Sequence, residues 1–136
     1  MNWEPLYTIM DFWDCPRSGV ACVQGIAHAY TSVFDEAKDD YLDTYLVSPI
    51  EPEAMPLILE NWDIWVRWES AYQAGLTTIE THPVLPEDRP RHEEIKKLLR
   101  GRAEVDRANY RSLRVDFRRK DQLPGGRDNW EAAWHI

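Results

Sequence analysis

Residues 57–72 read LILENWDIWVRWESAY, and this stretch predicts one long helix. At 100° per residue, Trp62, Trp65 and Trp68 fall on one side of the helix together with Tyr72, while the charged side chains gather on the opposite side. Large aromatic side chains at helical spacing usually face inward and bury much apolar area. We therefore expect the tryptophan stripe to form the centre of the core.

Proline and glycine delimit this helix. Pro56 fits the first turn, and Gly75 is a common end signal just beyond the last aromatic residue. Because Trp68 lies at the edge of the stripe, it is the one tryptophan of the three that we consider for a ligand-facing role.

The N-terminal third predicts a β-meander, because short apolar runs alternate with turn residues. Gln24-Gly25 is the clearest of its turns, since the pair suits a two-residue hairpin in which glycine takes a positive φ. The expected strands are Tyr7–Trp13, Val20–Val23, Ile26–Phe34 and Thr44–Ser48, with turns or loops over Asp14–Gly19 and Asp35–Asp43.

A hairpin at Gln24-Gly25 sets a register in which Val23 opposes Ile26, Ala21 opposes His28 and Gly19 opposes Tyr30. The other face then carries small side chains, and a bulky helix packs well on such a surface. We expect the tryptophan helix to lie across this face. Its residues are Val20, Cys22, Ala27, Ala29, Thr31 and Val33.

The second half of the chain predicts a further helix and a hairpin. The helix is expected from about Asp88 to Asp106, with Pro90 in its first turn. Residues 113–117 and 130–136 alternate as strands around a turn at 124–126, although a helix over 109–117 competes with the first of them. Together these elements predict one α+β domain over 1–136, a mostly antiparallel sheet (N-terminal meander plus C-terminal hairpin) packed against two helices.

Composition restricts the function. The chain has 136 residues and a net charge of −8, and residues 1–60 hold eleven acidic against two basic residues. Such a chain is a poor partner for nucleic acid. No apolar run reaches the length of a membrane span, and Met1–Pro5 does not resemble a secretory signal, so we expect a cytoplasmic protein. Cys15 and Cys22 are then expected to be free thiols.

The uneven charge favours a non-enzymatic, acidic protein-binding module of the adaptor or immunity type. Its partner would carry a basic surface, or would be a second copy that offers its own basic residues between Arg111 and Lys120. The surface expected to bind combines the first turn with the acidic loop. Its residues are Asp14, Arg17, Ser18, Asp39, Asp40 and Asp43.

The alternative is a small-molecule-binding protein or enzyme with a pocket at the sheet–helix edge, formed by His28, Tyr30 and Trp68. No catalytic group, metal or cofactor is predicted. The run His92-Glu93-Glu94-Ile95-Lys96 begins like a zinc-protease helix, but Lys96 stands where the second histidine is required. The acidic loop lacks the spacing of a calcium loop, and no glycine-rich phosphate loop is present.

Residues 11–21, DFWDCPRSGVA, followed by Gly25 and His28, resemble the opening of a family of small uncharacterised bacterial proteins. That opening reads aromatic-Asp-Gly-Pro-x-x-Gly-hydrophobic-Ala, and here Cys15 replaces the glycine before Pro16. Asp63-Ile64-Trp65 and His82-Pro83 are similar to segments of the same proteins. The resemblance implies a bacterial origin, and it transfers no activity and no functional residue.

Overall fold

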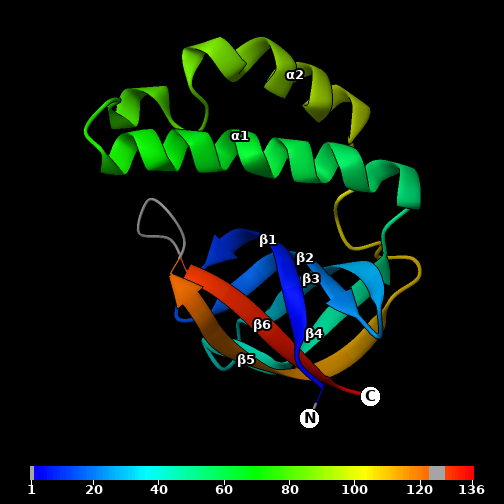
Figure 1. The fold of residues 1–136 in the computed structure, drawn as a ribbon. Helices are drawn as coiled ribbons and strands as arrows, with labels where there is room; N and C mark the ends of the chain where they lie inside the picture. The colour runs from blue at the N-terminus through cyan, green and yellow to red at the C-terminus, as the bar shows by residue number, and fades with distance from the viewer. Residues whose placement is uncertain (1, 123–127) are drawn as a thin grey trace.

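The chain folds into a closed six-stranded antiparallel barrel with two helices above one side, in a computed structural model that describes residues 2–122 and 128–136 (Figure 1). The strands are β1 (Glu4–Phe12), β2 (Pro16–Val23), β3 (Ile26–Asp35), β4 (Asp40–Pro49), β5 (Arg111–Gln122) and β6 (Asp128–His135). The helices are α1 (Met55–Gln73) and α2 (Arg89–Leu98), with short 3₁₀ turns at Pro52–Ala54, Ile79–Thr81 and Pro86–Asp88.

The closed barrel corrects the expected open sheet. The predicted meander and the predicted C-terminal hairpin are joined by pairing of β4 with β5, and β1 pairs with β6 through Glu4 and Ala132. Alternation of side chains has the same period in an open sheet and in a barrel, so the sequence pattern does not distinguish them. Closure satisfies the backbone groups that two free sheet edges would expose.

The hairpin between β2 and β3 has the predicted register. Val23 pairs with Ile26, and Gly19 pairs with Tyr30. Gln24 and Gly25 have φ angles of 52° and 81°, as a tight hairpin turn requires. The predicted turn over Asp14–Gly19 is wrong in its extent, because β2 already begins at Pro16.

The two faces of this hairpin serve two different cores. Ala21, Val23 and Tyr30 point into the barrel, where they meet Tyr45 and Trp134. The small outer face packs against the start of the helical part, since Val20 and Ala29 share a cluster with Ile50, Ala54 and Ile58. The predicted contact between the helix and the small face is therefore confirmed only for the first turns of α1.

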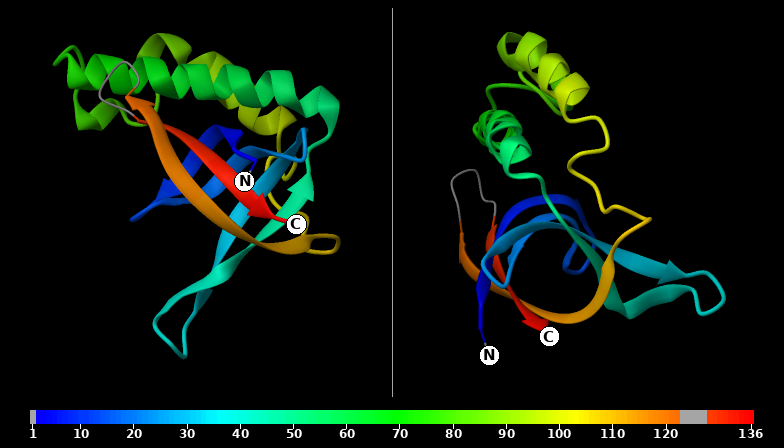
Figure 2. Two further views of the ribbon diagram at one scale, coloured as in Figure 1. Left: turned by 60° about the horizontal axis from the view of Figure 1, so that its bottom comes forward. Right: turned by 90° about the vertical axis from the view of Figure 1, so that its right-hand side faces the viewer.

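The two helices lie side by side, and α2 lies farther from the barrel than α1 does (Figures 1 and 2). Their shared core is small and consists of Ile64, Val84 and Ile95, with Leu57 and Leu99 packed against it. In the part of the chain that the structure describes, no helix is both long and apolar enough to span a membrane.

The predicted bounds hold for α1 but not for α2. The second helix ends at Leu98, and the chain continues to β5 without regular helix or strand. Gly101, with a φ of 74°, suits the end of a helix because only glycine adopts such angles freely. Residues 111–117 lie in β5, so the helical alternative for 109–117 is wrong. The predicted turn at 124–126 lies outside the described residues.

Candidate functional site

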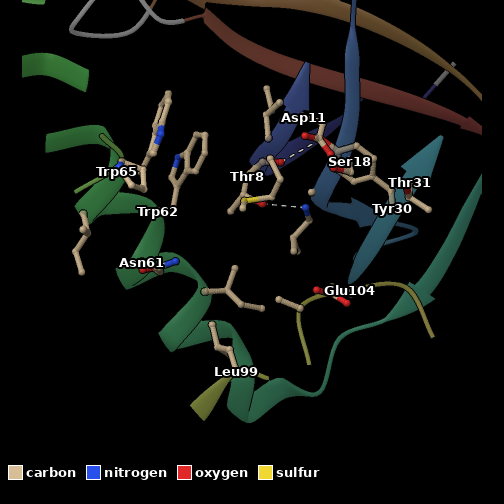
Figure 3. A pocket seen from close by; sticks show the side chains of 18 of the residues that line it. Thr8, Asp11, Ser18, Tyr30, Thr31, Asn61, Trp62, Trp65, Leu99 and Glu104 are labelled. Atoms are coloured by element: carbon tan, nitrogen blue, oxygen red, sulfur yellow. Dashed lines mark hydrogen bonds between the residues drawn. The ribbon is translucent and has the colours of Figure 1, made fainter. Parts of the chain in front are cut away.

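A cleft of about 800 Å³ separates α1 from the outer face of β1, β2 and β3 (Figure 3). It exists because the start of α1 packs on the barrel through Ile58 and through Ala54 just before the helix. Among residues 2–122 and 128–136, no core cluster joins the later turns of α1 to the barrel. Residues of α2 and of the segment that leads from α2 to β5 close one end, among them Leu99 and Glu104.

The helical wall of the cleft presents Trp62 and Trp65, whose rings stack with centroids 5.1 Å apart and planes 15° from parallel. Both side chains are half-buried and face the cleft (Figure 3). The prediction that they form the centre of the core is wrong. The buried tryptophan of the stripe is Trp68, with 4% of its surface exposed.

Helical periodicity cannot predict which of the three tryptophans is most buried, because the residues that cover each ring lie in other parts of the chain. Trp68 donates its indole hydrogen to Thr81 Oγ1 at 2.8 Å, and its ring lies against His82 and stacks on Tyr72. Trp62 and Trp65 lie before this turn of the helix, and their side chains face the cleft instead.

Hydrogen bonds fix the opposite wall. Ser18 Oγ donates to Asp11 Oδ2 at 2.9 Å, and Thr8 Oγ1 accepts a hydrogen bond from the Val20 amide at 2.9 Å. Gly19 lies so close to β1 that a Cβ at this position would sit 2.2 Å from the Thr8 carbonyl oxygen. Any larger residue would push β1 and β2 apart, so glycine is required for this wall.

A polar pair lies on the helical side of the cleft. His92 of α2 has Nδ1 2.7 Å from Asn61 Oδ1 of α1, and both residues line the cleft. Burial, followed by the positive charge of Lys96, lowers the pKa of the His92 imidazole. Sequence reasoning missed this pair: Asn61 and His92 are 31 positions apart, and His92 was considered only as a zinc ligand.

The predicted binding residues do not form one site. Asp14 pairs with Arg17 at 2.5 Å, which lowers the pKa of the aspartate, and Arg17 also lies 3.8 Å above the ring of Tyr41. A second, smaller pocket of about 390 Å³ lies between the start of β4 and β5. It is lined by Arg17, Asp40 and Asp43, among other residues.

The remaining two predicted binding residues lie elsewhere. Ser18 is on the wall of the large cleft, and Asp39 is in the turn between β3 and β4 with a φ of 52°. Cys15, next to Arg17, is half-buried with Sγ 3.6 Å from the Tyr45 hydroxyl. Burial raises the pKa of this thiol, which keeps it protonated.

The alternative set of pocket residues is also dispersed. Tyr30 lines the cleft and donates its hydroxyl hydrogen to the Thr8 carbonyl at 3.1 Å; burial raises its pKa well above the usual value. His28 is buried in β3 with Nδ1 2.8 Å from the Ile26 carbonyl. Trp68 is buried against the turn after α1. A cleft between sheet and helix therefore exists, but its helical wall is built from Asn61, Trp62 and Trp65.

No cluster of three or more histidine, cysteine or acidic side chains suited to a metal ion occurs within residues 2–122 and 128–136. Comparisons with family models, with curated proteins and with solved structures give no match for this chain.

Proposed function

We propose that this protein binds a small planar organic molecule in the cleft between α1 and the barrel. The observation that carries the proposal is the stacked pair of Trp62 and Trp65, half-buried and facing a hydrogen-bonded polar wall across the cleft. We propose binding without catalysis, because the uneven charge and the lack of a catalytic motif in the sequence favour a non-enzymatic protein.

The size of the cleft supports this function. Pockets for organic ligands commonly measure about 300–1,000 Å³ and combine apolar walls with a few convergent polar groups. At about 800 Å³, the cleft has this combination. Ile9, Met10 and Val20 contribute apolar surface from the barrel, while Asp11 and Ser18 contribute polar atoms.

The tryptophan pair supports a planar ligand. Leaving part of two indoles in water forgoes roughly 25 cal/mol for each Å² of apolar surface that could be buried. An aromatic ligand would recover this energy, and stacked or edge-to-face rings add about 0.5–1.5 kcal/mol beyond the buried area. The fixed barrel wall opposite holds polar atoms in place before a ligand arrives, which lowers the entropic cost of binding.

A screen of aromatic fragments followed by NMR tests the proposal. A bound fragment is expected to shift the indole N–H signals of Trp62 and Trp65 and to leave those of Trp68 and Trp134 in place. The latter two N–H groups donate to Thr81 and to the Cys22 carbonyl inside the protein. Fragments that shift all indole signals equally, or none, would contradict the proposal.

Substitution separates the cleft from other aromatic surfaces. Trp65→Ala is expected to weaken fragment binding at least tenfold, because it removes the stacking surface. Trp13→Ala is the matched control, since Trp13 is 77% exposed and lies outside the cleft lining. Asp11→Asn on the barrel wall provides a second test that leaves the helix intact. Equal effects of Trp65→Ala and Trp13→Ala would indicate nonspecific aromatic contacts.

A second candidate function is docking of a protein with a basic surface onto the hairpin of β3 and β4. This hairpin projects beyond the barrel, and an edge-to-face contact between Phe34 and Tyr41, 5.1 Å apart, supports it (Figure 2). Its tip carries four exposed acidic side chains against one lysine, Lys38. The acidic residues are Glu36, Asp39, Asp40 and Asp43.

Pull-down with charge-reversed protein tests the second function. Lysine at positions 39, 40 and 43 is expected to abolish recovery of a basic partner. Three reversals at other exposed acidic residues, Glu53, Glu80 and Glu87, change the net charge equally and serve as the control. If both triple variants lose the partner to the same extent, the hairpin is not a specific surface.

A further inference from the structure

His92 is held in one orientation by Asn61. The amide oxygen of asparagine only accepts hydrogen bonds, so the imidazole nitrogen 2.7 Å away must carry the hydrogen. In a neutral imidazole the other nitrogen then has a free lone pair. Asn61 therefore selects the ring form in which Nε2 is an acceptor.

The Nε2 atom is available to a ligand. None of the residues that the structure describes forms a hydrogen bond with it, and His92 is one of the residues that line the cleft. Burial and the charge of Lys96 both favour the neutral ring, which is the form that accepts a hydrogen bond. At neutral pH the helical wall thus offers one fixed acceptor.

This acceptor lies beside the aromatic surface. Asn61 is four positions before Trp65 on α1, and residues at this spacing are neighbours on one face of a helix. Figure 3 shows Asn61 on the same wall as Trp62 and Trp65. A flat molecule lying against the indoles can therefore direct its edge toward the imidazole that Asn61 holds.

We propose that His92 Nε2 accepts a hydrogen bond from the ligand, so that the ligand is a planar ring system carrying an N–H or O–H donor. This inference rests on the proposed function, because it assigns a ligand class to the same cleft. It also gives His92 a binding role, whereas the sequence around His92 shows only an incomplete zinc motif.

Matched probes test the inference. 2-Naphthol carries an O–H donor, and 2-methoxynaphthalene has the same rings without it. For the wild-type protein, we expect 2-naphthol to bind about tenfold more tightly in NMR titrations, as one hydrogen bond allows. In His92→Phe, which keeps a flat ring without the acceptor, the two affinities are expected to become equal. An unchanged tenfold ratio in His92→Phe would overturn the inference.

A second variant and a spectroscopic readout guard against misfolding of His92→Phe. Asn61→Leu leaves the imidazole in place but no longer selects its protonated nitrogen, so the ratio between the probes is expected to fall by several fold. Nitrogen chemical shifts of His92 in the free wild-type protein should show hydrogen on Nδ1 and none on Nε2. Hydrogen on Nε2 would overturn the inference without any ligand.

The same titrations separate failure of the inference from failure of the proposed function. One outcome is that both probes bind, both lose affinity in Trp65→Ala, and the ratio of their affinities is the same in His92→Phe as in the wild type. In that case the cleft binds planar molecules but His92 plays no part. If neither probe binds the wild-type protein, or if Trp65→Ala binds both as well as the wild type does, the cleft is not a site for planar ligands and both proposals fall.

Discussion

The barrel interior has a larger hydrophobic core than the helical pair. Inside the barrel, the large rings of Tyr30, Tyr45, Phe117 and Trp134 contact one another, and both tyrosine hydroxyls donate to backbone carbonyls. The core between the two helices is a small cluster of Ile64, Val84 and Ile95. Ion pairs add to it, because Arg91 of α2 pairs with Glu60 of α1 and Asp88, just before α2, pairs with Arg67 of α1.

The two walls of the cleft differ in how firmly they are held. A core of large, hydrogen-bonded aromatic residues holds the barrel wall of the cleft in one geometry. The opposite wall belongs to helices with little core of their own, and such elements open locally at lower free energy than the rest of a protein. We therefore expect the barrel wall of the cleft to stay fixed and the helical wall to be the one that moves more easily.

The largest expected effect is in the barrel. Trp134 is 8% exposed, contacts Tyr30 and Phe117, and donates to the Cys22 carbonyl at 3.0 Å. Trp134→Ala is expected to lower the free energy of unfolding by about 3–5 kcal/mol. Urea titration followed by circular dichroism measures it, with Trp13→Ala as a control expected to change less than about 0.5 kcal/mol. If the two variants lost similar amounts of unfolding free energy, the barrel interior would not be the firmly packed region proposed here.

The next effect should stay within the helices. Ile95 is fully buried between α2 and α1, and Ile95→Ala is expected to cost about 2–3 kcal/mol. Hydrogen exchange should show faster exchange of the α1 and α2 amides and unchanged exchange in β2 and β3. Equal acceleration in barrel and helices would mean that the molecule opens as a single unit.

A smaller effect concerns Glu4, a buried carboxylate where β1 pairs with β6 and closes the barrel. Glu4 accepts hydrogen bonds from the Gln24 and Gly25 amides, at 2.9 and 2.8 Å, and from the Cys22 thiol. Glu4→Ala leaves these donors without an acceptor and is expected to cost about 1–3 kcal/mol. Glu4→Gln retains one side-chain oxygen and should cost less. Thermal unfolding of both variants shows which one is less stable, and we expect it to be Glu4→Ala.

The smallest effect is expected on the helical surface. Arg67 donates to both carboxylate oxygens of Asp88, at 3.0 and 2.9 Å, and the hydrogen bond lowers the pKa of Asp88. Because the Arg67 side chain is about half exposed to solvent, Arg67→Gln is expected to cost less than about 1 kcal/mol.

The pH dependence of this cost follows from the lowered pKa. The unfolded Asp88 has a pKa near 3.9, so the stabilisation is fully present above that value and disappears as the pH falls through the lower folded-state pKa. Urea titrations of wild type and Arg67→Gln should differ by a constant amount between about pH 5 and 7, and the difference should shrink below the unfolded pKa as Asp88 becomes protonated. A difference that grew at low pH would contradict the assignment.

Local patterns predicted the elements that depend on neighbouring residues. The helix through the tryptophans, the Gln24-Gly25 turn with its register, and the strand over 113–117 are all found in the structure. Each depends on side-chain periodicity or on the φ preferences of a turn, and both are properties of a short segment.

The candidate site was much less predictable. Tyr30 and Ser18 were singled out and do line the cleft, but Asn61, Trp65 and His92 were not predicted for it. Trp65 was assigned to the core because periodicity shows which side of a helix is apolar and says nothing of what covers that side. Asn61 and His92 meet only because the chain turns between α1 and α2.

Short-range patterns in the sequence specify where the chain is helical or extended and which side chains share a face. Contacts between distant segments close the sheet into a barrel, turn Ala21 and Tyr30 inward and Val20 and Ala29 outward, and attach α1 to the barrel through its first turns. Both faces of the β2–β3 hairpin are apolar, so alternation allows either to be the interior. Only the packing of distant segments selects one, and the same packing leaves Trp62 and Trp65 facing a cleft.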